Sequence, residues 1–178
     1  RLAVENAIEQ AVTQGNTRAA RNNVAMAVGD LVRDGQDART PMRTILLNSI
    51  RRNRSAGGAI GALKVMADAQ KKTNHKLYDA PEGIDRVITS LENHPMLKNM
   101  KLEVVDSVDN LPDDIKNEYA KRNNRVSGLY SADNDTLYLS GDVTEGALGG
   151  RFSTVVHELV HATTLRALNL HKAGKLKD

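Results

Sequence analysis

The first 74 residues contain no aromatic side chain, which limits the kind of hydrophobic core that they can build. Their apolar residues are mainly Ala and Val and recur at spacings of three and four, as at Val24, Val28 and Leu31. This period is typical of amphipathic helices. Small side chains bury little apolar area each, so we expect residues 1–74 to be a helical part that needs a partner, or the rest of a larger parent protein, for its stability.

Charge and aromatic content both change near residue 75. Residues 1–74 hold twelve Lys or Arg and six Asp or Glu, a net charge of +6, whereas residues 75–178 hold thirteen and sixteen, a net charge of −3. All five aromatic residues lie in the second part. We therefore interpret residues 1–74 as a basic helical segment and residues 75–178 as a separate domain. Because the chain begins with Arg1 rather than Met, we expect a piece of a longer protein whose second domain is open to truncation at its C-terminal end.

Several classes of protein are excluded by what the sequence lacks. No run of about 18 apolar residues occurs, so we expect no membrane span. No signal-peptide pattern opens the chain, which predicts a protein that is not secreted. Cysteine is absent, which excludes disulfides and Cys-type zinc sites and leaves the cellular compartment open.

The second part combines helical periods with short alternating runs, which predicts an α+β fold with a small sheet. A polar run between two short apolar segments is typical of a β-hairpin. The expected elements are helices over 83–93 and from 111 to about 121, a strand over 102–105, hairpin strands at 128–130 and 136–139, a loop over 141–150, and a final helix.

That final helix carries the sequence His157-Glu158-Leu159-Val160-His161, which has the pattern H-E-x-x-H. Residues four apart on a helix lie about 40° apart around its axis, so the two imidazoles point the same way and can bind one cation at about 2.0–2.1 Å. Glu158 lies at the edge of the same face, where it can take a proton from metal-bound water. The alternative is a surface helix that happens to expose two His and one Glu.

The segment from Gly128 to Thr163, with its hairpin followed by the H-E-x-x-H helix, resembles the core of gluzincin-type zincin metallopeptidases. Domains of this kind are embedded in large polyvalent proteins of phages and mobile elements. The resemblance covers about residues 100–170. It implies a small zincin-like domain that hydrolyses peptide bonds with Zn²⁺, with His157 and His161 as zinc ligands and Glu158 as general base. It also implies a peptide or protein substrate and a place in a phage virion or the bacterial host cytoplasm.

The resemblance further implies that strand 136–140 is the sheet edge along which an extended peptide binds. Thr136, Tyr138 and Ser140 would then be substrate-binding residues, with backbone pairing by β-augmentation. The alternative is an ordinary half-buried edge strand. Tyr130 or Tyr138 is a candidate for a hydroxyl that stabilises the oxyanion, against the alternative of a half-buried hairpin aromatic.

The third zinc ligand is not identified by the motif, although a catalytic zinc needs three protein ligands and a water. The metzincin extension would require Gly and His where the chain has Thr164 and Ala167, and no Glu lies downstream of the motif as a gluzincin-like set would need. The candidates are a residue beyond 178 in a longer parent, His171 if the helix ends near Leu170, and Asp178 or an upstream residue. His171 has the alternative role of a cation that complements the helix dipole.

Two other functions stay open. Without its third ligand the fragment would bind metal poorly and be inactive, and the fold would then be a vestigial zincin in a non-catalytic assembly module of a phage or mobile-element protein. Separately, the basic residues Arg51, Arg52 and Arg54 are candidates for contacts with nucleic-acid phosphates. The alternative for them is a solvated helix end.

Overall fold

The computed structural model describes residues 2–14, 17–35, 48–74, 83–122, 128–140 and 152–176. These residues are mostly helical with one three-stranded sheet, which confirms the α+β prediction. The helices are α1 (Leu2–Thr13), α2 (Arg18–Arg33), α4 (Ala56–Thr73), α5 (Ile84–Glu92), α6 (Asp113–Lys121) and α8 (Phe152–Lys172), with the 3-10 helices η1 (Pro95–Leu97) and η2 (Val108–Asn110). The strands are β1 (Lys101–Val105), β2 (Gly128–Ser131) and β3 (Thr136–Ser140), and residues 48–53 are also helical. The expected loop over 141–150 lies outside the described residues.

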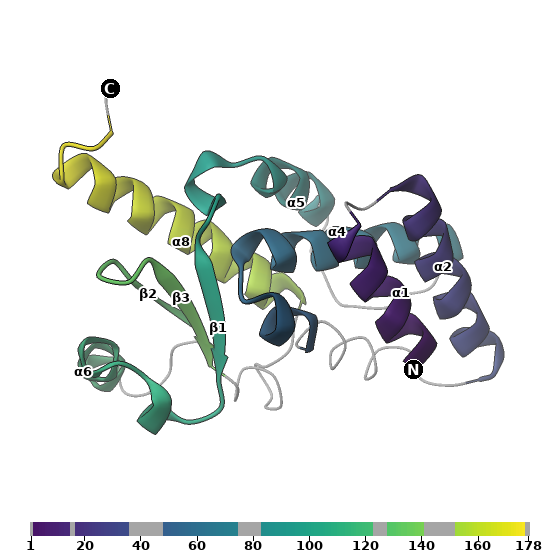
Figure 1. Cartoon of the computed structure of the whole chain (residues 1–178), viewed down its shortest axis with the longest axis horizontal. Helices are drawn as coiled ribbons and strands as arrows, with labels where there is room; N and C mark the ends of the chain where they lie inside the picture. Colours follow the sequence, from purple (N-terminus) through teal and green to yellow (C-terminus); the bar gives the residue numbers. More distant parts are fainter. Residues whose placement is uncertain are drawn as a thin grey trace.

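The helices of the N-terminal part follow the apolar period of the sequence. Val24, Val28 and Leu31 are buried along one face of α2, as predicted. Thr17 begins α2 by accepting a hydrogen bond from the Ala20 amide at 3.2 Å, and Ser55 begins α4 by accepting one from the Gly58 amide at 3.0 Å. Such side-chain caps satisfy amide groups that the first turn of a helix leaves without partners. Figure 1 shows α1 and α2 at one end of the molecule, α4 near the middle, and the sheet with α6 and α8 at the other end.

One hydrophobic core crosses the expected boundary at residue 75. Leu63 and Met66 of α4 belong to the same buried cluster as Ile88 of α5, Leu137 of β3 and Leu159 of α8. Hydrogen bonds join the parts as well: the carbonyl of residue 54 accepts from the amide of residue 102 at 3.1 Å, and the carbonyl of residue 100 accepts from the amide of residue 56 at 3.0 Å. A domain has its own core, so the boundary at 75 does not separate two cores in this structure. Part of the apolar surface of residues 1–74 is therefore buried against the rest of the chain.

The strand order of the sheet is β1-β3-β2. β3 pairs in parallel with β1, with Lys101 opposite Thr136, and antiparallel with β2, with Gly128 opposite Leu139. The hairpin is therefore confirmed, but the prediction that strand 136–140 is a sheet edge is wrong, because β3 is the central strand. The local sequence carries no signal for the parallel pairing with β1, which depends on residues more than thirty positions away.

Successive side chains of β3 face opposite sides of the sheet, as the strand period requires. Leu137 and Leu139 join the large core beside α4 and α8. Tyr138 faces a second, smaller cluster with Leu129 of β2, and α6 contributes Ile115 to that cluster. The sheet is thus covered by helices on both faces, and α8 lies on the face of the large core.

The motif helix α8 buries one side and exposes the other. Val155, Val156 and Leu159 are buried, whereas Val160 is 40% exposed. The helix ends where Gly174 adopts a φ of +67°, a left-handed conformation that glycine adopts without a steric penalty. In the described parts of the chain, no helix combines the length and apolar character that crossing a membrane would require.

Candidate metal centre

His157 and His161 lie on successive turns of α8, and both side chains are exposed. Their Nε2 atoms are 2.9 Å apart, and the ring centroids are 4.4 Å apart with an angle of 72° between the ring planes. Two nitrogens bound at about 2.0–2.1 Å to one tetrahedral ion would be about 3.3 Å apart. A small rotation of either ring would open the observed distance to that value. The observed 2.9 Å is a hydrogen-bond distance, with one ring nitrogen donating to the other, so the two imidazoles meet at one place on the exposed face of α8.

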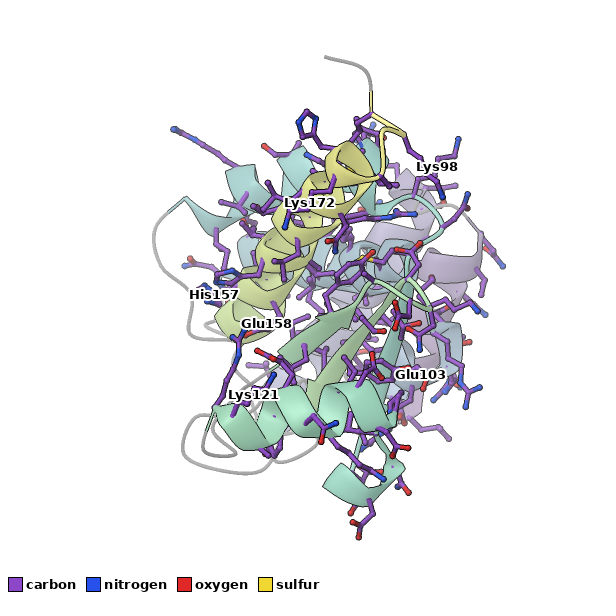
Figure 2. All side chains as sticks on the ribbon, turned by 90° about the vertical axis from the view of Figure 1, so that its left-hand side faces the viewer. Lys98, Glu103, Lys121, His157, Glu158 and Lys172 are labelled. Atoms are coloured by element: carbon purple, nitrogen blue, oxygen red, sulfur yellow. The ribbon has the colours of Figure 1, made fainter. Side chains whose placement is uncertain are left out.

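Glu158 lies beside this pair and is half-buried against β2. A Cβ atom placed on Gly128 would lie 3.0 Å from Oε2 of Glu158, so the backbone of β2 passes directly along the carboxylate. Figure 2 shows His157 and Glu158 near the end of α8 that faces the sheet and α6. The three residues of the motif thus place two exposed imidazoles and one half-buried carboxylate on neighbouring positions of two successive helical turns.

Burial raises the pKa of the Glu158 carboxyl above its ordinary value of 4.5. The neighbouring imidazoles of His157 and His161 act in the opposite direction, and so does the guanidinium of Arg122, which follows α6. The burial effect is the largest of these. A carboxylate with raised proton affinity is better suited to take a proton from water near neutral pH than an exposed one.

A third metal ligand is not assembled by the described residues, which contain no group of three or more His, Asp or Glu placed to hold one ion. The structure does not bring His171 to the pair. α8 continues through Leu170 to Lys172, so His171 is ten residues after His161 on the same helix, about 15 Å along its axis. The condition under which His171 was a candidate, a helix that ends near Leu170, is not met. Asp178 lies outside the described residues.

The residues predicted to bind substrate do not form a free strand edge. Thr136 and Tyr138 are buried, and the Thr136 hydroxyl donates to the carbonyl of Asn134 at 3.1 Å. The third, Ser140, lies opposite Val105 of β1. Within the described residues, strand edges without a strand partner belong to β1 and β2, and residues 54–56 already contact the start of β1. The edge beside Glu158 is that of β2.

Both candidate tyrosine hydroxyls are engaged at the hairpin turn. The hydroxyl of Tyr130 donates to Oδ1 of Asp135 at 2.6 Å, and burial together with this carboxylate raises the Tyr130 pKa. The hydroxyl of Tyr138 accepts from the Asn134 side chain at 2.8 Å. These contacts support the alternative, in which the two tyrosines are hairpin aromatics rather than groups that stabilise an oxyanion.

Arg166 links the motif helix to two neighbouring segments, a role that the sequence did not reveal. Its Nη1 donates to the carbonyls of Met96 at 2.5 Å and Lys98 at 2.9 Å, and its Nη2 donates to Oδ2 of Asp135 at 2.6 Å. Only 16% of its side chain is exposed. In the sequence, an arginine in the second half of a helix is indistinguishable from an ordinary surface cation. Gly128 was also missed, although a glycine inside a strand pattern is a known signal of close backbone approach.

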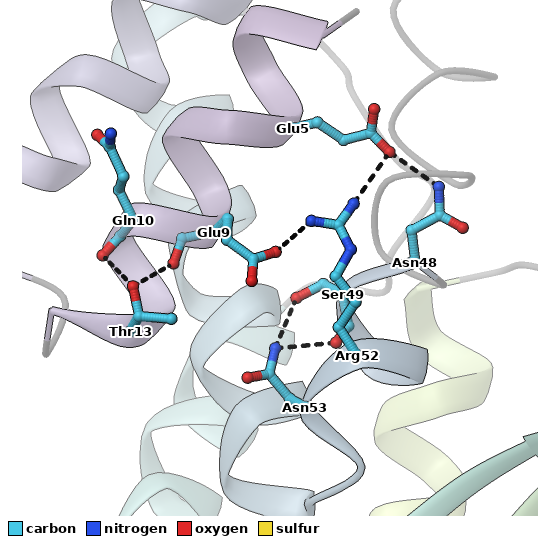
Figure 3. A network of polar contacts seen from close by, with 8 residues as sticks. All are labelled: Glu5, Glu9, Gln10, Thr13, Asn48, Ser49, Arg52 and Asn53. Carbon is cyan, nitrogen blue, oxygen red and sulfur yellow. Dashed lines mark hydrogen bonds and ion pairs between the residues drawn. The ribbon is translucent and has the colours of Figure 1, made fainter.

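The basic cluster is partly neutralised within the chain. Arg52 forms ion pairs with Glu9 at 2.5 Å and Glu5 at 3.6 Å, in a network that also includes Asn48 (Figure 3). Arg51 pairs with Asp106 at 2.8 Å. Two of the three predicted phosphate contacts therefore already face carboxylates.

The described structure thus brings together His157, Glu158 and His161, and it adds Gly128 and Arg122 to their surroundings. It leaves His171 and the residues of β3 apart from this centre. Comparisons of the chain with protein-family models, with curated proteins and with solved structures give no match.

Proposed function

We propose that this chain hydrolyses peptide bonds with a zinc ion held by His157 and His161. The observation that carries the proposal is the convergence of the two Nε2 atoms, 2.9 Å apart, on the exposed face of α8 beside a half-buried carboxylate. When bound, zinc lowers the pKa of its water to near 7 and polarises the scissile carbonyl. Glu158 would be the general base that accepts a proton from the attacking water and later passes it to the leaving amine.

The raised pKa of Glu158 supports this role. A general base works best when its pKa is close to the working pH, and burial against Gly128 moves the carboxyl in that direction. The imidazoles and Arg122 act against the shift that burial causes. The substrate that we propose is an extended peptide, whose backbone would pair with the edge of β2, which has no strand partner among the described residues.

The remaining zinc ligand is proposed to come from outside the described residues. The candidates are Asp178, an upstream residue, and a residue of a longer parent protein. Two imidazoles alone hold zinc more weakly than a full set of three protein ligands. We therefore expect zinc affinity to depend strongly on both imidazoles.

A second candidate function is a non-catalytic assembly module with a vestigial zincin fold. The observation that favours it is that the described residues contain no group of three potential metal ligands. Such a module would keep the helical core that joins α4 to the sheet and would have no need of Glu158. The two functions differ in metal content and in peptide cleavage.

The proposal is tested by loading the full chain with Zn²⁺, measuring bound metal, and following cleavage of a random peptide mixture by mass spectrometry. His157→Ala and His161→Ala should each lose zinc. Glu158→Gln should keep zinc and lose cleavage by about 10²–10⁴-fold, the usual contribution of a positioned base. Glu103→Gln on β1 is the matched control and should keep both properties. Absence of zinc and of cleavage in the wild type would favour the assembly module.

His171→Ala tests whether His171 is a zinc ligand, as the sequence suggests, or too distant, as the geometry of α8 indicates. Since the helix places this residue about 15 Å from His161 along its axis, its loss should leave zinc affinity unchanged. A fall of tenfold or more in zinc affinity would show that the helix end rearranges when metal binds.

A further inference from the structure

Gly128, the first residue of β2, borders the side chain of Glu158. A Cβ atom at this position would lie 3.0 Å from Oε2, 3.1 Å from Cγ and 3.2 Å from Cδ of Glu158. Contacts this short are tighter than those that carbon side chains normally make, so one of the two groups would have to move. Because Cγ is involved as well as the oxygen, a rotation of the carboxylate alone would not relieve the contact.

The conformation of Gly128 gives no other reason for glycine. Positive φ values among the described glycines occur at Gly35, Gly83 and Gly174, and Gly128 is not among them. Gly128 begins β2, so the cost of about 0.5–1 kcal/mol that glycine carries in the middle of a strand does not apply to it in full. The feature that distinguishes this position in the described structure is the close approach of its backbone to Glu158.

We propose that Gly128 is a positioning residue for Glu158: the bare backbone of β2 forms the wall that holds the carboxylate beside the two imidazoles. This inference rests on the proposed function for its catalytic consequence, whereas the contact itself can be tested without any activity. β2 thus limits the place of the base, while α8 sets the place of the imidazoles.

The contact is tested by a double-mutant cycle in the stability of the metal-free full chain. Gly128→Ala should lower the melting temperature by a few degrees, although a strand alanine without the contact would raise it. In the Glu158→Ala background, where all three contacting atoms are removed, Gly128→Ala should leave the melting temperature unchanged or raise it. Gly29→Ala on α2 is the matched control, because no atom lies within 4 Å of its added Cβ.

The positioning role is tested with one peptide that the zinc-loaded wild type cleaves. Gly128→Ala should lower kcat about tenfold through displacement of the base, with KM and zinc affinity unchanged. Glu158→Asp shortens the side chain by one methylene and withdraws it from β2. In this background Gly128→Ala should cost no further kcat, an outcome that a purely structural role of Gly128 would not produce.

The outcomes separate the two proposals. Equal effects of Gly128→Ala in the wild-type and Glu158→Ala backgrounds would overturn the contact, whatever the activity. If the melting temperatures show the expected coupling but kcat is unchanged in Gly128→Ala, the positioning role would be overturned. The cycle could also show the expected coupling between Gly128 and Glu158 while the wild type neither binds zinc nor cleaves peptides. That result would retain the contact and reject both the catalytic role and the proposed function.

Discussion

Replacement of Arg166 by Ala should destabilise the protein more than replacement of any exposed cation. The guanidinium donates to two carbonyls, of Met96 and Lys98, and to the carboxylate of Asp135. Asp135 also accepts from Tyr130, so the side chain connects α8, η1 and the hairpin turn. Truncation removes three hydrogen bonds and leaves a carboxylate without its cation.

The magnitude follows from the exposure of the two charged groups. A hydrogen bond to a charged group contributes about 1.5–3 kcal/mol, and breaking a buried ion pair costs about 3–5 kcal/mol. The side chain of Arg166 is 16% exposed but that of Asp135 is 37% exposed, so water can solvate part of the carboxylate after truncation. Screening of this kind reduces the expected loss to about 3 kcal/mol. For a chain of this size that corresponds to a melting temperature lower by about 6–12 °C.

Urea denaturation followed by circular dichroism would measure this loss. Arg166→Lys is the informative companion, because lysine keeps the charge but cannot bridge three acceptors with a planar fork. It should recover less than half of the lost stability. A loss below about 0.5 kcal/mol for Arg166→Ala would refute the reasoning, since surface cations away from such networks commonly fall in that range.

Three further predictions test the burial and ionisation of single side chains. In metal-free protein, Glu158→Gln should be more stable than the wild type at neutral pH. A carboxyl whose pKa is raised by folding stabilises the folded state below the unfolded pKa, and this stabilisation is lost as the pH rises through the folded pKa. The melting temperatures of the wild type and Glu158→Gln should therefore approach each other below about pH 4.5. A difference in melting temperature that stays constant with pH would contradict this expectation. Leu63→Ala should cost about 2–5 kcal/mol and keep a single unfolding transition, since Leu63 is fully buried in the shared core, whereas two resolved transitions would argue for two cores. Arg52→Ala should cost less than about 1 kcal/mol in urea melts, because its side chain is 47% exposed, and a larger loss would show that the network with Glu9 is more than a surface pair.

The elements that the sequence predicted correctly are those whose signals are local. The apolar period of α2, the polar turn before Thr136 and the Pro112 that precedes α6 each depend on residues within one or two turns. The strand order could not be predicted in this way. Pairing of β1 with β3 joins residues 101–105 to residues 136–140, and no feature of either strand distinguishes a central from an edge position.

In the candidate site too, the features that depend on neighbouring residues could be predicted, and those that depend on distant residues could not. The spacing of four between His157 and His161 places their side chains on one face of the helix, and the rotamers of both rings then bring the two Nε2 atoms together. The burial that raises the pKa of Glu158 includes contact with β2, and Arg122 at the end of α6 acts in the opposite direction; both are distant from Glu158 in sequence. Gly128 is also distant in sequence from Glu158, and a glycine at the first position of a strand is too common to predict the close approach that the structure shows.

The shared core gives the N-terminal helices a part in the geometry of the candidate site. Leu159 lies between His157 and His161 in the sequence and belongs to the same buried cluster as Leu63 of α4. A helix whose buried face packs against a fixed core keeps its exposed face in a fixed orientation, because interiors are close-packed and tolerate little displacement. α4 contacts α5, and α5 contacts α8, so residues 1–74 reach the helix that presents the two imidazoles mainly through α5. We therefore expect residues 75–178 expressed alone to melt at a lower temperature than the full chain, because the cluster that is shared across residue 75 would lose the side chains of α4.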